Sequence, residues 1–217
     1  MIKFGHAEVT GWEHAIRGMR NPLNSWSKID SNYIYDDYEE YHVGDNDLDL
    51  MKRLRKAGTD HRKFMRMITV YVDITAPLYW WKEFDTYKVG TVANSCSTMH
   101  KIHAKEFELS DFSYEHLIDG VVGLDELYNP YKHFCNTVTC LNQCRRAYLK
   151  TKDKKYWWQM IQLLPSSYNQ KRTVMMNYEV LANIYKSRKT HKLDEWSIGF
   201  IEWIKTLPHS ELITGEE

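Results

Sequence analysis

The chain has 217 residues and a mass of 25.9 kDa, so we expect a single domain over residues 1–217. Hydrophobic residues make up 43% and charged residues 27%, which excludes wholesale disorder because a sizeable core can form. Lys and Arg number 29 together, as do Asp and Glu. This balance argues against a nucleic-acid polymer as partner but leaves room for a local basic pocket that holds one phosphate or nucleotide.

The sequence predicts a cytoplasmic protein without a membrane span. The most apolar stretch, residues 67–81, is shorter than the roughly 20 residues that a helix needs to cross a membrane. The amino-terminal residues lack the apolar core of a secretory signal. Three of the four cysteines, Cys135, Cys140 and Cys144, fall in one predicted helix, which favours reduced thiols over a disulfide framework. No second ligand pair has a matching spacing, so we expect no metal.

The first half of the chain alternates between irregular and regular patterns. Residues 27–47 are expected to form a surface excursion, with an acidic, aromatic run at 36–41. A helix follows, capped by Asn46 or Asp47 and ended by Gly58. Apolar residues then alternate with polar ones over 68–74, which predicts a strand buried on one face.

A second helix is expected next, and the chain is then mostly helical. Thr75 is its expected cap, and Pro77 lies in its first turn, where the missing N–H costs nothing. Residues 90–100 are small and hydrogen-bonding without a period, which is typical of a ligand-contacting loop and of any other loop. Further helices are expected over 134–148 and 156–163 and from Asn177 to about Leu207, the last with room for a break.

The last helical region carries charged residues on an otherwise apolar face. Spacings of three and four place six residues there: Leu181, Ile184, Arg188, His191, Glu195 and Ile198. A neighbouring stripe is purely apolar and is expected in the core: Leu193, Trp196, Phe200, Trp203 and Leu207. The charged groups need partners, because an unpaired buried charge is costly. Glu195 could pair with Arg188 and His191, or Arg188 could face a cavity and bind an anion through its planar donor fork.

Two stretches resemble the flavin-dependent thymidylate synthases. Leu164-Pro165, residues 173–177 and Arg188 match that family's Leu-Pro pair, strand ending in Asn and helix N-x-R-x-L-x-x-F-x-x-L-R without a gap. Residues 48–100 share the family's order of helix, histidine, strand, Ala-Pro helix and loop. The loop departs from the family signature R-H-R-x-x-S-x-N-E-x-S-x-R-Y, of which Asn94 and Ser97 remain.

The resemblance implies an α/β (α+β) fold with a twisted, largely antiparallel sheet flanked by helices, in a homotetramer. It implies FAD as cofactor, a uracil nucleotide as substrate, and methylenetetrahydrofolate and NADPH as co-substrates. It assigns the substrate to Arg188, Ser97 and Asn94, and the cofactor to Asn177 and His61, while Lys88 and Lys192 could add positive charge. The alternatives are a helix cap for Asn177, loop hydrogen bonding for Ser97 and Asn94, a structural histidine and solvated lysines. No catalytic side chain is assigned, because the flavin carries the redox chemistry.

The expected function is therefore that of a flavin-dependent thymidylate synthase-like enzyme of nucleotide biosynthesis, with divergent binding residues. Each lost charge-assisted contact costs roughly 1.5–3 kcal/mol, or about ten- to a hundredfold in affinity. Losing several arginines without replacement would abolish ordinary binding. One alternative is therefore a non-catalytic nucleotide-binding or regulatory oligomer on the same scaffold. Another is a structural interaction protein, since its many Trp and Tyr residues suit interfaces.

Overall fold

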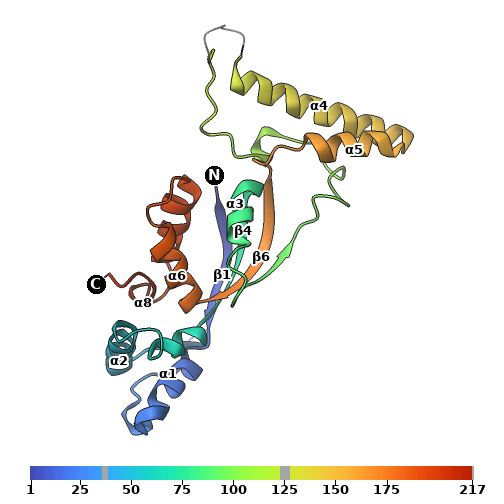
Figure 1. Ribbon diagram of the computed structural model, residues 1–217. Helices are drawn as coiled ribbons and strands as arrows, with labels where there is room; N and C mark the ends of the chain where they lie inside the picture. The colour runs from blue at the N-terminus through green and yellow to red at the C-terminus, as the bar shows by residue number, and fades with distance from the viewer. Residues whose placement is uncertain (36–38, 123–127, 217) are drawn as a thin grey trace. The chain divides into compact units, whose positions relative to one another are not determined.

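The structure is a computed structural model that describes residues 1–35, 39–122 and 128–216 (Figure 1). The chain divides into two compact units. The first unit comprises Met1–Lys3, Thr75–Thr86 and Ser95–Arg172, and the second comprises Phe4–Ile74, Tyr87–Asn94 and Thr173–Glu217. The expectation of a single domain stays a prediction. Residues 36–38 of the acidic run lie outside the described residues.

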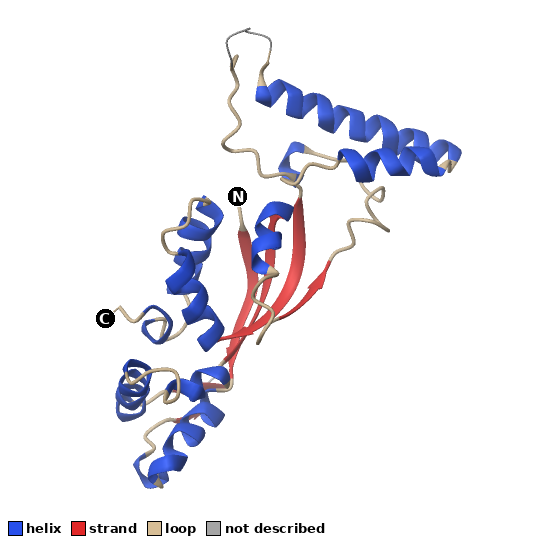
Figure 2. Cartoon of the chain, in the orientation of Figure 1, coloured by secondary structure: helices blue, strands red, loops and turns tan. Residues whose placement is uncertain are grey.

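Four strands form one sheet in the order β1–β4–β6–β5 (Figure 2). Their bounds are Lys3–Thr10 for β1, Thr69–Pro77 for β4, Asn169–Asn177 for β6 and Val92–Ser95 for β5. The sheet is small and antiparallel, with helices flanking it, which confirms the predicted fold class. The strand β5 lies within the stretch for which a loop was expected.

The strand β4 confirms the alternating pattern and extends beyond it. Val70, Val72 and Ile74 are buried, whereas Tyr71 is 45% exposed. The strand continues to Pro77, so the prediction that Thr75 caps a helix is wrong. The residue before a proline is driven toward extended backbone, and this keeps the chain in the strand until Pro77. The helix α3 (Leu78–Phe84) then begins.

The second unit contains most of the short elements. In chain order they are α1 (Trp12–Arg20), the 3-10 turns Asn21–Leu23 and Trp26–Lys28, β2 (Asn32–Tyr35), β3 (Glu39–His42), α2 (Asp45–Lys56), the 3-10 helix η3 (Arg62–Arg66), α6 (Tyr178–Arg188), the π-helix η5 (Glu195–Phe200), α7 (Ile201–Lys205) and α8 (Glu211–Thr214). The expected excursion thus contains an antiparallel hairpin, in which Asn32 pairs with His42.

The cap of α2 comes from outside the predicted segment. The carboxylate of Asp30 accepts hydrogen bonds from the backbone N–H groups of Asn46 and Asp47, at 2.8 and 3.0 Å. Gly44 precedes the helix, and no side chain at that position caps it. The prediction that Asn46 or Asp47 caps the helix is therefore wrong, because a more distant acid satisfies the first N–H groups.

The last helical region contains the break for which the prediction left room, but the prediction that six of its residues share one helical face is wrong. The helix α6 ends at Arg188, and helical structure resumes only at Glu195. Between them the imidazole of His191 accepts the N–H of Leu193 at 3.1 Å, which is a local turn contact rather than a helical one. Ile198 is accordingly 54% exposed. The apolar stripe is largely confirmed, since four of its members are buried: Trp196, Phe200, Trp203 and Leu207.

The first unit holds a pair of adjacent helices, α4 (Pro130–Thr151) and α5 (Lys154–Leu163), which confirms two predicted helices (Figure 1). One hydrophobic cluster of this unit consists of Ile102, Phe107, Phe112, Phe134, Val138, Leu141 and Met160, and Cys144 packs against it. The four cysteines are free thiols. Among the described helices, none is both long enough and apolar enough to span a membrane.

Candidate functional site

Arg188 lies at the carboxyl end of α6, between two aromatic rings. Its Nε donates a hydrogen bond to the hydroxyl of Tyr87 at 2.8 Å. The guanidinium carbon is 5.0 Å from the ring centre of Trp196 and 5.6 Å from that of Tyr87. Both distances suit cation–π attraction, and a planar guanidinium stacks well on such rings. We call Tyr87, Arg188 and Trp196 the Arg188 cluster.

The segment that contains Tyr87 also approaches the amino end of α6. Gly90 has a φ of 79°, and a Cβ there would lie 3.0 Å from Val180 and 3.2 Å from the side-chain nitrogen of Asn177. Glycine therefore permits both the left-handed backbone and the close approach. The segment 87–90 thus contacts both ends of α6, and it places Lys88, which is exposed, near this helix.

Asn177 ends β6 and caps α6. Its side-chain oxygen accepts the N–H of Val180 at 3.0 Å, which confirms the helix-cap alternative. The cap fixes where the helix starts, and eleven residues later the helix ends at Arg188. A role of Asn177 toward a flavin stays a prediction.

A second group of charged residues joins α6 to η3. Glu179 stands where the family pattern N-x-R has its arginine, and it is only 6% exposed. Arg66 forms an ion pair with Glu179, and the Nε of Arg62 is 3.4 Å from the same carboxylate. Arg62 also donates to the side-chain oxygen of Asn183 at 3.2 Å. We call Arg62, Arg66 and Glu179 the Glu179 cluster.

Two arginines and one carboxylate give the Glu179 cluster a net charge of +1. Burial alone would raise the pKa of Glu179, but the hydrogen bond and charge of Arg66, with those of Arg62, bring it below its ordinary value. Glu179 is therefore ionised at neutral pH. Neither arginine was among the predicted site residues, although the two lie four residues apart directly after His61.

The remaining predicted residues occupy more exposed positions. His61 is exposed and directly precedes Arg62, while Asn94 in β5 and Lys192 after α6 are exposed in the same unit. Ser97 belongs to the first unit, where its hydroxyl accepts the N–H of His100 at 2.9 Å, as the loop alternative predicts. The structure thus brings Lys88, Asn177 and Arg188 to one helix. The binding roles of all seven residues stay predictions.

The fold is that of the flavin-dependent thymidylate synthases, which confirms the resemblance at the level of architecture. The chain is similar to thymidylate synthase X (ThyX) from Helicobacter pylori, solved with FAD and dUMP, at 17% identity and a TM-score of 0.69, covering 100% of this chain and 98% of that one. It is also similar to the UMP/dUMP methylase PolB from Streptomyces cacaoi, bound with 5-Br UMP, at 12% identity and a TM-score of 0.63, with 99% and 94% covered. No protein-family model and no curated protein matches the sequence.

Proposed function

We propose that this protein is a flavin-dependent methylase of a uracil nucleotide, of the dUMP to dTMP type. The observation that carries the proposal is the Arg188 cluster, on a fold shared over the full chain with ThyX and PolB. FAD, when bound, would supply the reducing equivalents. Methylenetetrahydrofolate as the one-carbon donor and NADPH as the reductant belong to the same proposal, as do a homotetramer and a cytoplasmic setting.

Arg188 is proposed to hold the nucleotide. The hydrogen bond to Tyr87 and the ring of Trp196 fix the plane of the guanidinium. A fixed plane is what two-point recognition of a phosphate or a pyrimidine oxygen requires. Asn94 and Ser97 are proposed to add hydrogen bonds to the same substrate.

The donor set of the second unit fits an anionic cofactor. FAD carries two phosphates, which need cationic partners. The family pattern has an arginine, and so one positive charge, at the position of Glu179. Together Arg62, Arg66 and Glu179 also carry a net charge of +1. We therefore infer that these arginines replace part of the charge missing from the degenerate loop. His61, Asn177, Lys88 and Lys192 are the further residues proposed to face the cofactor.

A second candidate is a nucleotide-binding protein that performs no chemistry. The observation that favours it is Glu179, because a buried carboxylate at an arginine position weakens any site for an anion. In that case a uracil nucleotide would bind and FAD would not.

The decisive experiment is an absorbance spectrum of freshly purified protein, before and after incubation with FAD. We expect flavin bands in the near-ultraviolet and blue, and turnover of dUMP when methylenetetrahydrofolate and NADPH are added. The variant Arg62→Gln should lose FAD affinity, whereas the exposed Lys63→Gln beside it should not. A protein that takes up no flavin but binds dUMP would reject the enzyme in favour of the second candidate.

A further inference from the structure

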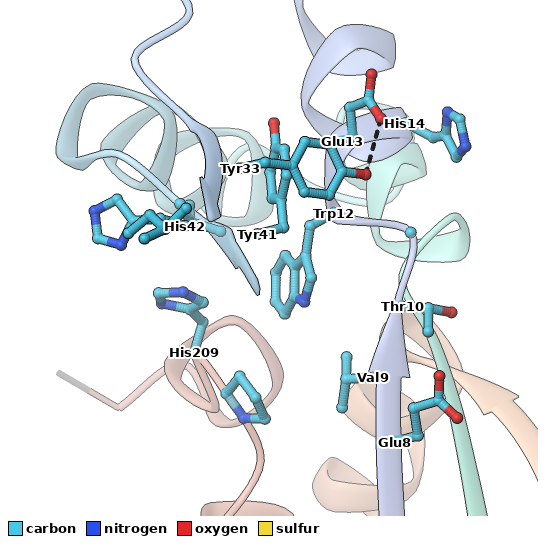
Figure 3. A pocket seen from close by; sticks show the side chains of 14 residues that line it. Glu8, Val9, Thr10, Trp12, Glu13, His14, Tyr33, Tyr41, His42 and His209 are labelled. Atoms are coloured by element: carbon cyan, nitrogen blue, oxygen red, sulfur yellow. Dashed lines mark hydrogen bonds between the residues drawn. The ribbon is translucent and has the colours of Figure 1, made fainter. Parts of the chain in front are cut away.

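A cavity of about 530 Å³ lies in the second unit, and none of its lining residues belongs to the Arg188 or Glu179 clusters (Figure 3). The end of β1, the start of α1, the β2–β3 hairpin and the turn at His209 form its walls. Its volume falls within the range of small-molecule sites, roughly 300–1,000 Å³. The proposed function makes no use of this cavity.

Aromatic side chains line the cavity from three elements (Figure 3). The rings of Tyr33 and Tyr41 meet edge to face across the hairpin, with centroids 4.9 Å apart. Trp12 meets the imidazole of His209 edge to face, with ring centroids 5.2 Å apart. It meets the ring of Tyr178 in the same way, at 5.3 Å. Trp12 is 7% exposed, so its position is fixed by packing.

Two left-handed backbone positions build the walls. Gly11 has a φ of 91°, and a Cβ there would collide with the carbonyl oxygen of Met67. His209 adopts a φ of 49°, which is uncommon for a residue other than glycine. Such positions persist where the surrounding structure enforces them, and they often mark sites of function.

The charge of the described lining is negative. It contains the carboxylates of Glu8 and Glu13 and three imidazoles, and it contains no Lys or Arg. Other hollows of the described chain do contain such groups, for example Arg17 in one and Lys52 in another. Glu13 accepts a hydrogen bond from the Tyr33 hydroxyl at 3.2 Å. The guanidinium of Arg17 is 4.0 Å from its other oxygen, and both side chains are exposed, so screening by water weakens this ion pair.

Tyr41, which pairs with Tyr33 from the strand β3, lies close to the same carboxylate. Burial, followed by the charges of Glu13 and Asp47, raises the pKa of Tyr41 to about 12. Burial therefore disfavours the ionised phenol first, and the two carboxylates add to this effect.

We propose that this cavity binds a small organic cation of the ammonium class. The π faces of Tyr33, Tyr41 and Trp12 attract an ammonium group, and Glu13 supplies the opposite charge. Burial lowers the pKa of His209, which keeps the imidazole neutral, so that it adds no positive charge to the lining. An anion would find no cationic side chain among the described lining residues.

The test uses the full chain and choline, with 3,3-dimethyl-1-butanol as its neutral carbon isostere, in calorimetry and NMR titration. We expect saturable choline binding and an isostere at least about tenfold weaker. Glu13→Gln and Tyr33→Leu should each weaken choline binding about tenfold. Glu202→Gln, an exposed change on α7, should leave it unchanged.

Three results would overturn the proposal. One is the absence of saturable choline binding up to about 50 mM by the wild-type chain with native circular dichroism. Another is equal affinity for choline and the isostere, which would show a merely apolar pocket. The third is binding of Zn²⁺ with no effect of ammonium compounds, which would indicate a metal site.

Discussion

Two arginines of the second unit, Arg20 and Arg188, have different kinds of neighbour. Arg20 is 4% exposed, and its Nε and Nη2 lie 2.6 and 2.5 Å from one carboxylate oxygen of the buried Asp47. The other oxygen of Asp47 accepts hydrogen bonds from Asp30 and Ser31. Arg188 is half-buried and is oriented by a phenol and an indole.

We propose that Arg20 is a structural arginine and Arg188 a binding one. Asp47 neutralises Arg20 and joins α1 to the start of α2, so this pair specifies the fold. The uncharged side chains of Tyr87 and Trp196 are among the groups that orient Arg188. Loss of Arg20 or its partner should therefore affect stability, whereas loss of Arg188 should affect ligand affinity.

The largest expected effect comes from breaking the buried pair. Asp47→Asn leaves the guanidinium of Arg20 buried without a counter-charge, so the free energy of unfolding should fall by about 3–5 kcal/mol. Urea denaturation followed by circular dichroism measures it. The control is Asp49→Asn on the same helix, whose partner Arg53 is 2.9 Å away with both side chains 67% exposed. That exposed pair should contribute less than about 1 kcal/mol. Equal losses in the two variants would contradict the structural role of Arg20.

The second effect is on binding. Arg188→Gln should weaken dUMP by about ten- to a hundredfold, which corresponds to roughly 1.5–3 kcal/mol for a charge-assisted contact. Calorimetry measures the affinity, and urea denaturation should show a much smaller change than for Asp47→Asn. Lys186→Gln, an exposed change on the same helix, is the matched control. An Arg188→Gln protein that binds dUMP normally but unfolds at lower urea concentration would show that Arg188, like Arg20, has a structural role.

Long periodic patterns predicted much of the fold. The alternation around Val72 and the apolar spacing of α4 each encode one element, and gapless spacing from Pro165 to Arg188 led to the correct architecture. Predictions from neighbouring residues were wrong where a residue distant in the sequence made the contact. Asp30 caps α2 from 15 residues before its first helical residue, Asp45, and no rule based on adjacent residues includes such a partner.

The candidate site was less predictable. The family spacing pointed to Arg188 as a binding residue, but its contact with Tyr87 joins residues 101 positions apart. The Glu179 cluster was missed because Arg62 and Arg66 become relevant only when η3 lies against α6. The β2–β3 hairpin was missed because its strands are only four residues long and carry no clear alternation.

A subtler change tests how Arg188 is oriented. Tyr87→Phe keeps the ring but removes the hydroxyl that accepts the hydrogen bond from Nε. A bond of this kind contributes about 0.5–1.5 kcal/mol, so dUMP affinity should fall about three- to tenfold while stability changes little. Tyr71→Phe, at an exposed tyrosine of β4, serves as the control. Unchanged affinity in Tyr87→Phe would show that this hydrogen bond is not needed to orient the guanidinium.

The smallest expected effect is a change of stability with pH, and it depends on the imidazole of His209. Burial lowers the pKa of His209 from its ordinary value of 6.5, which outweighs the opposing charge of Glu211; Lys52 and His42 lower it further. The unfolded chain therefore binds a proton more readily. Stability from the neutral imidazole is present above pH 6.5 and is lost as pH falls toward the folded-state pKa.

His209→Asn removes this titration and suits the left-handed backbone, because asparagine tolerates positive φ. Between about pH 7.5 and 5, the wild-type chain should lose more unfolding free energy than the variant, by about 1.4 kcal/mol for each unit by which the pKa is lowered. Urea denaturation at several pH values measures the difference, in which the titration of shared groups cancels. Parallel curves would mean that the imidazole is as well solvated in the folded chain as in the unfolded one. The lining of the cavity beside it would then gain a positive charge as the pH falls below 6.5, whereas Arg20 and Arg188 would be unaffected.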